Sequence, residues 1–297
     1  MSDVVIAALY HFAPLPDFEA MQAPIRAACA EAGVRGTLLL ADEGINGTIA
    51  GSAAGIDAVL AYLRSDARLS ALDEKRSTAP SNPFPRLRVR LKREIVTMGV
   101  PGVDPRKRVG SYVEPEAWNS LLEDPDVLVI DTRNEYEVKL GTFRNARSPG
   151  TETFREFPAY VERELKGQEH RPIAMFCTGG IRCEKATAYL LDQGFDNVHH
   201  LHGGILKYLE TVPEAESLWQ GECYVFDERV TVTHALTPGD AVQCEACGEP
   251  LSAAEQASPQ FEADISCPYC IDELTPERRA ALEMRRDQRQ RARAANG

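Results

Sequence analysis

The sequence lacks any long apolar run, any basic leader at its start and any repeat of fixed period. Its apolar stretches all fall short of the roughly 20 residues that a membrane-spanning helix requires. No segment has the biased composition of a low-complexity region. These absences argue against a helical membrane protein, a signal-bearing secreted protein and a repeat array. We therefore expect a cytoplasmic protein with no membrane partner.

Positive charge is also scarce in this chain. Lysine and arginine total 33 residues against 45 aspartates and glutamates, which gives a formal net charge of -12. A chain this acidic does not coat nucleic acid indiscriminately. Two basic segments stand out against that background. Each fits a selective site for a polyanion such as RNA, and the alternative for each is ordinary solvated surface.

The first basic segment is RLRVRLKR, residues 86–93. On a strand, its alternation puts the leucines and the valine on one face and the positive charges on the other. The positive residues are Arg86, Arg88, Arg90 and Lys92. The second basic segment is a helix expected at the end of the chain, which carries seven arginines, Arg285 and Arg286 among them.

The length and composition predict a globular protein of several domains. With 297 residues, 43% of them hydrophobic and 26% charged, the chain is too long for one ordinary core. Its patterns divide it into residues 1–100, residues 116–217 and residues 218–297. The glycine- and proline-rich residues 99–115 are expected to link the first two parts.

The first part has strand and helix signals in the order βαββαβ. Helices are expected over residues 17–32 and after Ser52, a residue suited to an N-cap. The basic segment, continuing into EIVTMG, is expected to be the last strand. This order is typical of the ferredoxin-like, or acylphosphatase-like, fold, in which two helices cover one face of an antiparallel sheet.

The second part contains three short apolar runs, VLVIDTR, PIAMFC and NVHHL, with helical segments between them. Strands alternating with helices predict an α/β domain with a central parallel sheet and helices on both sides. Functional groups of such sheets lie beyond the carboxyl ends of the strands. Cys177 stands at such an end.

The residues after Cys177 can hold a sulfur anion. They are Thr178, Gly179, Gly180, Ile181 and Arg182. The two glycines permit the tight, partly left-handed backbone that turns amides toward the sulfur. A helix that begins near Arg182 directs its partial positive charge the same way. A thiolate with a pKa below the ordinary value of about 8.5 is therefore favoured, and a buried structural cysteine is the alternative.

This loop, with DTRNEYE at 131–137 and HLHGGI at 200–205, resembles a single rhodanese domain. The resemblance implies that Cys177 is the catalytic nucleophile and can carry a persulfide, and that Arg182 closes the loop. It also implies structural contacts for Asp131 and Arg133. Residues 141–143, GTF, depart from the GHI that many rhodaneses have after the acidic segment.

Nearly the whole chain resembles a narrower family. EGINGT at 43–48, PFPRLRVRLKREIVTMG at 83–99, the cysteine loop and the terminal cysteine pairs are similar, in that order, to the rhodanese-type tRNA uridine hydroxylases that use molecular oxygen. This implies conversion of the wobble uridine in the tRNA anticodon loop to 5-hydroxyuridine, with oxygen as co-substrate and an unidentified reductant. A sulfurtransferase that passes persulfide sulfur to a small molecule or protein, and a non-enzymatic RNA-binding module, are the alternatives.

Cys183 and three histidines have two interpretations each. Cys183 can resolve an oxidised Cys177 as a disulfide or simply pack in the core. His199, His200 and His202 can supply a base or contact RNA, or they can be structural.

The last four cysteines form two CxxC pairs, CEAC and CPYC, separated by nineteen residues. They are Cys244, Cys247, Cys267 and Cys270. This spacing is typical of a structural zinc site with four sulfur ligands, and a redox pair is the alternative. Four ligands leave no open position for catalysis. We expect zinc to stabilise a tail too small to bury its own core.

Overall fold

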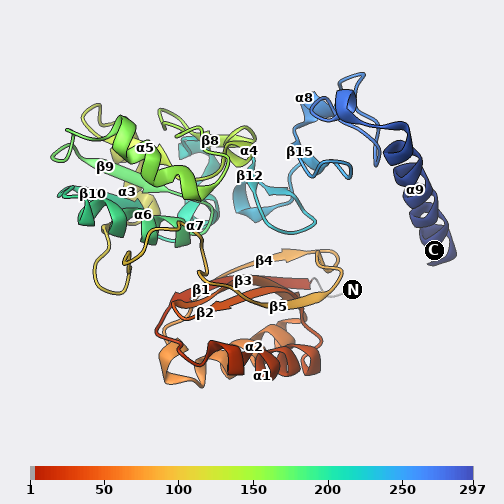
Figure 1. Cartoon of the computed structure of the whole chain (residues 1–297), viewed down its shortest axis with the longest axis horizontal. Coiled ribbons are helices and arrows are strands. Elements are labelled where there is room, and N and C mark those ends of the chain that lie inside the picture. The colour runs from red at the N-terminus through yellow and green to blue at the C-terminus, as the bar shows by residue number, and fades with distance from the viewer. Residues whose placement is uncertain (1–3, 297) are drawn as a thin grey trace.

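The computed structural model describes residues 4–296, which form two larger domains and a small module that carries the C-terminal helix (Figure 1). The first domain lies below the second in that view, and its helices cover the sheet face that points away from the second domain. Its elements are β1 (Val4–Phe12), α1 (Phe18–Glu31), β2 (Arg35–Ala41), β3 (Gly44–Gly51), α2 (Ala53–Arg64), β4 (Asp73–Ala79) and β5 (Leu87–Leu91). A short 3-10 helix, Ala67–Leu69, precedes β4.

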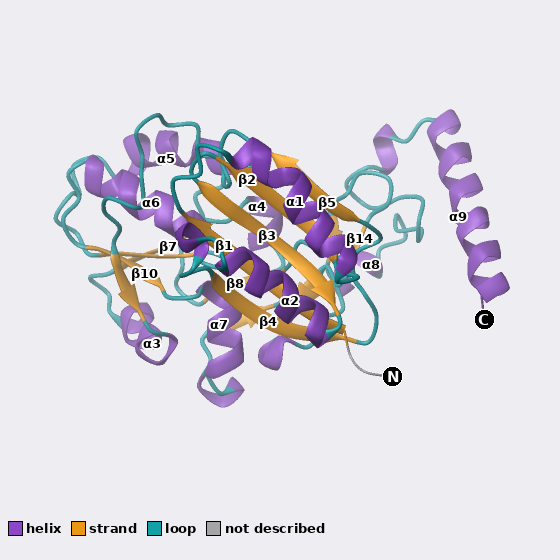
Figure 2. Cartoon of the chain, turned by 90° about the horizontal axis from the view of Figure 1, so that it is seen from below, coloured by secondary structure: helices purple, strands orange, loops and turns teal. Residues whose placement is uncertain are grey.

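The first sheet has the strand order β4-β1-β3-β2-β5, which confirms the ferredoxin-like fold. Figure 2 shows α1 and α2 lying across this sheet. Alternate strand residues such as Leu38 and Ile49 are fully buried beneath the helices, together with Ile56 of α2. Ser52 caps α2 as predicted, because its hydroxyl accepts the Gly55 N–H at 3.1 Å.

The prediction of the last strand was wrong. The fourth strand of the fold is β4, whose sequence DEKRSTA pairs antiparallel with β1. The basic segment forms β5, an additional edge strand that pairs in parallel with β2. Residues 94–99 continue as irregular chain instead of extending β5. The error arose because β4 is a polar edge strand whose side chains pair with acidic residues, so it has no clear apolar alternation.

The second domain has a four-stranded parallel sheet in the order β6-β10-β9-β7, as predicted for an α/β domain. One buried cluster lies under α5 and α6, and another under α3 and α7, so helices cover both faces. The elements are β6 (Ser111–Val113), α3 (Pro115–Glu123), β7 (Leu128–Asp131), α4 (Glu135–Val138), β8 (Gly141–Phe143), α5 (Phe157–Glu164), β9 (Ile173–Phe176), α6 (Ile181–Asp192), β10 (Val198–Leu201) and α7 (Gly204–Thr211). Two 3-10 helices, Phe154–Glu156 and Glu214–Glu216, complete it.

Part of the expected linker is ordered strand. Residues 111–113 form β6 at the edge of the second sheet, and Val100 and Val103 pack against its core. The glycines and prolines of residues 99–115 therefore shape a connection that is held against the domain.

The C-terminal part begins on the second domain and then leaves it. Strand β11 (Trp219–Gly221) pairs with β8, and β12 (Cys223–Tyr224) pairs with β13 (Thr231–Val232). The small module contains β14 (Val242–Gln243), β15 (Pro250–Leu251) and α8 (Ala253–Gln256), and the predicted basic helix is α9 (Pro276–Asn296). Two further 3-10 helices are His234–Leu236 and Ile271–Glu273. Helix α9 projects away from both domains in Figures 1 and 2. Across residues 4–296, no helix is long and apolar enough to cross a lipid bilayer.

Candidate active site

The cysteine loop joins the end of β9 to the start of α6, as the sequence predicts. Gly180 is the N-cap of α6 and has a φ of +103°, a conformation that favours glycine. This conformation lets the Gly180 N–H donate to Cys177 Sγ at 3.2 Å. Gly179 does not have a positive φ, so the left-handed turn rests on Gly180 alone of the two glycines.

The surroundings of Cys177 favour its thiolate. The residue is 1% exposed, and burial by itself would raise the pKa of the thiol. The contact with the Cys183 side chain, the charge of Arg182 and the backbone N–H groups of Cys183 and Arg182 outweigh burial and lower the pKa of Cys177 well below its ordinary value. Burial and the neighbouring sulfur raise the pKa of Cys183, which therefore stays a thiol.

Arg182 is held by a buried carboxylate that the sequence did not reveal. Its Nη1 and Nη2 lie 2.5 Å and 2.8 Å from the carboxylate oxygens of Glu137, whose side chain is fully buried. Arg182 Nη2 also lies 3.3 Å from Thr178 Oγ1. This arrangement fixes both ends of the loop and orients a positive charge beside the sulfur.

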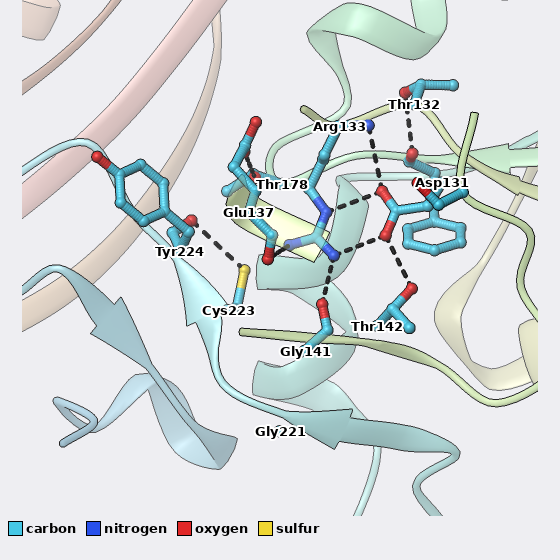
Figure 3. A network of polar contacts seen from close by, with 12 residues as sticks. Asp131, Thr132, Arg133, Glu137, Gly141, Thr142, Thr178, Gly221, Cys223 and Tyr224 are labelled. Carbon is cyan, nitrogen blue, oxygen red and sulfur yellow. Dashed lines mark hydrogen bonds and ion pairs between the residues drawn. The ribbon is translucent and has the colours of Figure 1, made fainter. Parts of the chain in front are cut away.

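A second buried ion pair, Arg133 with Asp131, contacts the backbone of Glu137, the partner of Arg182 (Figure 3). Arg133 donates to both oxygens of Asp131, at 2.9 Å and 2.6 Å, and to the carbonyl of Gly141 at 2.5 Å. The hydroxyl of Thr142 donates to Asp131 at 2.8 Å. The GTF segment, which departs from the common GHI, therefore supplies two of the groups that hold this pair.

The start of α7 anchors the loop carbonyls. The N–H groups of Ile205 and Leu206 donate to the carbonyls of Cys177 and Thr178, both at 3.0 Å. Gly204 has a φ of +67°, and a Cβ on it would lie 2.6 Å from each of those carbonyl oxygens. Only glycine allows this approach, which explains the second glycine of the HLHGGI segment.

Cys177 opens into a cavity of about 290 Å³ between the first domain, the loop and the β12–β13 hairpin. Tyr10 of β1 and Asn46 of β3 line it from the first domain, and Phe226 lines it from the hairpin. The open face of the ferredoxin-like sheet therefore forms one wall of the cysteine site. Neither domain alone could enclose this space.

A carboxylate and two tyrosines join the domains beside the loop. The hydroxyls of Tyr10 and Tyr112 donate to Glu184 at 3.1 Å and 2.9 Å. Burial raises the pKa of Glu184, and the negative charge of Cys177 raises it further. The two tyrosine hydrogen bonds lower this pKa but do not cancel the effect of burial. This cluster lies immediately after the cysteine loop and fixes it against β1.

A buried lysine makes a second junction between the domains. Lys185 Nζ lies 2.8 Å from Glu43, 2.6 Å from Glu94 and 2.9 Å from the carbonyl of Val96. Its side chain is 2% exposed. Glu43 begins the EGINGT segment, so part of that segment serves the attachment of the first domain to the cysteine helix.

The two basic segments differ in their electrostatic environment. Arg86, Arg88, Arg90 and Lys92 form no ion pair with any residue that the structure describes. The charge of Arg86 lowers the pKa of Arg88, with further contributions from burial and Arg90. Like charges are thus gathered here without local compensation.

Some arginines of helix α9 form ion pairs within the small C-terminal module. Arg286 pairs with Glu262 at 2.9 Å, and Arg289 pairs with Glu245 at 2.9 Å. Arg285 is exposed and has no ion pair among the described residues. The helix is therefore anchored to the module by salt bridges on one side while Arg285 faces solvent.

The four terminal cysteines converge, as predicted for a metal site. Their sulfur atoms all lie within 4.8 Å of one another, and three of the separations are 3.6, 3.7 and 3.9 Å. Sulfurs about 2.3 Å from a central zinc ion are about 3.8 Å apart in a regular tetrahedron. Gly248 closes one knuckle by donating its N–H to the carbonyl of Cys244 at 2.7 Å. The residues therefore fit a zinc ion with four sulfur ligands.

Comparisons with known proteins agree with this architecture. Residues 4–95 match the acylphosphatase-like domain of the UPF0176 family, and residues 114–211 match the rhodanese-like domain. A tRNA uridine(34) hydroxylase from Picosynechococcus sp. is 54% identical over 294 residues, which cover 99% of each chain. The chain belongs to the tRNA uridine(34) hydroxylase family.

Solved rhodanese-like structures resemble this member of the tRNA uridine(34) hydroxylase family over a smaller part. A domain from Anabaena sp. is 19% identical, covering 37% of this chain and 78% of that one, with a TM-score of 0.31. A Staphylococcus aureus domain is 21% identical, covering 33% and 90% of the two chains, with a TM-score of 0.28.

The three histidines lie outside the cavity of this tRNA uridine(34) hydroxylase family member, since none is among the described residues that line it. His200 is buried, and burial lowers its pKa to about 4. His199 contacts Asn197, and His202 contacts Glu114. These contacts favour the structural interpretation. Cys183 lies in the core beside Thr132, with 3.6 Å between Oγ1 and Sγ.

Proposed function

We propose that this protein hydroxylates uridine 34 in the anticodon loop of tRNA to 5-hydroxyuridine. The observation that carries the proposal is the 54% identity to a tRNA uridine(34) hydroxylase along 99% of both chains. Oxygen would be the co-substrate. One oxygen atom enters the base, and the other leaves as water after two electrons and two protons arrive from a reductant of unidentified source.

Cys177 is the residue that would meet the uridine. Its thiolate is stabilised by the Gly180 amide and Arg182, and it opens into the interdomain cavity. An uracil ring has to leave its stack to enter that space, and this costs least in a single-stranded loop. A cavity near 290 Å³ lies at the small end of ligand sites, which suits a single pyrimidine. The amides and Arg182 would keep the thiolate ready for nucleophilic contact with the ring.

The basic residues would bind the tRNA backbone. Arg88 and Arg90 of the edge strand β5, with Arg86 just before it, lie on the sheet face that lines the cavity. Leu87 and Val89, which alternate with them, pack on the helix side. Lys92 follows at the end of this ribbon. Arg285 and Arg286 on α9 would bind the tRNA backbone at a second, more distant place. Arg286 would then exchange its ion pair with Glu262 for one with a phosphate.

The zinc ion would have a structural role. Four cysteine ligands fill its coordination shell, so it would hold residues 242–270 and the base of α9 together without an open position for substrate.

Nucleoside mass spectrometry of tRNA tests the function. A deletion strain should lose 5-hydroxyuridine and its derivatives, and the wild-type protein and the Cys29→Ala variant should restore them. Cys29 is a buried cysteine in the first domain and serves as the matched control. The Cys177→Ser variant should not restore the modification. An unchanged tRNA profile together with thiosulfate:cyanide sulfur transfer would establish the sulfurtransferase instead.

A further inference from the structure

Phe226 is an unusual surface residue at the mouth of the cysteine cavity. Its side chain is 57% exposed, although burying a phenylalanine side chain typically stabilises a folded protein. The residue lies between β12 and β13 and lines the cavity that contains Cys177. A ring left in solvent at this position is available to a ligand.

The segment that carries Phe226 is firmly held. The N–H of Val225 donates to the carbonyl of Val230 at 2.8 Å, and the N–H of Glu228 donates to the carbonyl of Pro83 at 3.1 Å. Arg229 pairs with Asp227 at 2.7 Å and donates to Ser77 of β4 at 2.9 Å. The hairpin is thus fastened to the first domain by two residues that follow the ring in the chain, Glu228 and Arg229. A fixed aromatic ring loses little entropy when it binds a partner.

Positive charge and a second aromatic ring adjoin Phe226. The ring meets Tyr224 edge to face, with 5.2 Å between centroids. Phe226 and Tyr224 also line a groove that contains Arg86 and Arg88. Asp227 is neutralised by Arg229, whereas Glu228 adds a negative charge to the residues that line the groove. The anionic backbone of a bound RNA would therefore lie along Arg86 and Arg88, and one of its bases would lie over the ring of Phe226.

An exposed aromatic ring beside unpaired arginines is the arrangement that proteins use for single-stranded RNA, since bases stack on the ring and phosphates bind the cations. We propose that Phe226 is a stacking platform for the base of a nucleotide that adjoins the uridine in the Cys177 cavity. This inference rests on the proposed function. Stacking on Phe226 adds a contact to a neighbouring base, so that the anticodon loop is bound next to the nucleotide that leaves its stack.

The affinity for an anticodon stem-loop RNA, measured by fluorescence anisotropy at fixed salt, tests this role. Base–aromatic stacking energies imply that Phe226→Ala weakens binding by roughly 5- to 150-fold. Phe226→Leu keeps apolar bulk but no aromatic face and should lose affinity in the same way, whereas Phe226→Trp should retain it. The salt dependence of binding should stay unchanged, because no phosphate contact is removed.

Tyr62→Ala is the matched control, since Tyr62 is another exposed aromatic, 42% exposed, on α2 of the opposite sheet face. Unchanged alkylation of Cys177 would show that each variant keeps its cavity. If the wild-type protein binds the RNA and Phe226→Ala or Phe226→Leu binds it equally well, the stacking role is wrong while the proposed function stands. If the wild-type protein does not bind the RNA, both are wrong.

Discussion

Replacing Lys185 with methionine should weaken the junction between the first two domains. Methionine keeps most of the apolar stem but leaves Glu43 and Glu94 near one another without a cation. Breaking a buried ion pair by removing one partner costs about 3–5 kcal/mol. The side chains of Glu43 and Glu94 are 19% and 22% exposed and so keep some water. The lower end of the range, about 3 kcal/mol, is therefore expected.

Thermal unfolding followed by circular dichroism measures this effect. A loss of about 3 kcal/mol corresponds to a Tm lower by roughly 6–12 °C when the two joined domains unfold together as one unit of about 200 residues. Lys166→Met is the matched control, because Lys166 and its partner Glu162 are 68% and 65% exposed and such pairs contribute little. If both variants unfold at the same temperature as the wild type, the Lys185 cluster does not stabilise the junction.

The same cluster predicts a pH dependence. Burial tends to raise the pKa of Glu94, but the hydrogen bond from Lys185 and those from the Met98 and Gly99 amides lower it below its ordinary value. A carboxyl with a depressed pKa in the folded state stabilises the protein above its unfolded pKa of about 4.3, and this contribution is lost as the pH falls through the folded pKa. The difference in Tm between the wild type and Lys185→Met should therefore shrink in acid, and a constant difference would contradict the assignment.

Two further predictions concern the metal and the basic strand. Protein purified without chelator should contain close to one zinc per chain by elemental analysis. Removal of the zinc should make residues 242–270 sensitive to protease. Protein that contains no metal would overturn the zinc assignment. Replacing Arg88 and Arg90 with glutamine should lower the slope of log affinity for tRNA against log salt by about 1.5, since each phosphate contact contributes about 0.7–0.9. Arg144→Gln with Arg163→Gln, two exposed arginines of the second domain, is the matched control. An equal slope in both double variants would assign the β5 arginines to plain solvated surface.

The fold was predictable where local patterns are strong. Helices α1 and α2 follow from apolar periodicity, and the buried strands β7 and β9 follow from short continuous apolar runs. The fourth strand of the first sheet was missed because DEKRSTA is polar, and its pairing with β1 is a tertiary effect that its own sequence does not display. The sequence of β5 alternates strongly between apolar and basic residues, so it was predicted to be the last strand of the ferredoxin-like fold, which is β4.

The candidate site was predictable only where it is contiguous in the sequence. Cys177, Gly180 and Arg182 lie within one loop, so their spacing revealed the anion cradle. Glu137 lies 45 residues before its partner Arg182, and Tyr10 lies 174 residues before Glu184. A single sequence gives no sign of such distant pairs. Only the packing of the two domains brings them to the loop.

The Cys177 thiolate is tested most directly by the rate at which iodoacetamide alkylates this residue as a function of pH, followed by mass spectrometry of the peptide that contains it. A thiol with a lowered pKa is already ionised at neutral pH, so the rate should be constant from about pH 7 to 9 and should fall only in acid. A rate that is low at pH 7 and rises through pH 8 to 9, as for an ordinary cysteine, would contradict the thiolate on which the proposed chemistry depends.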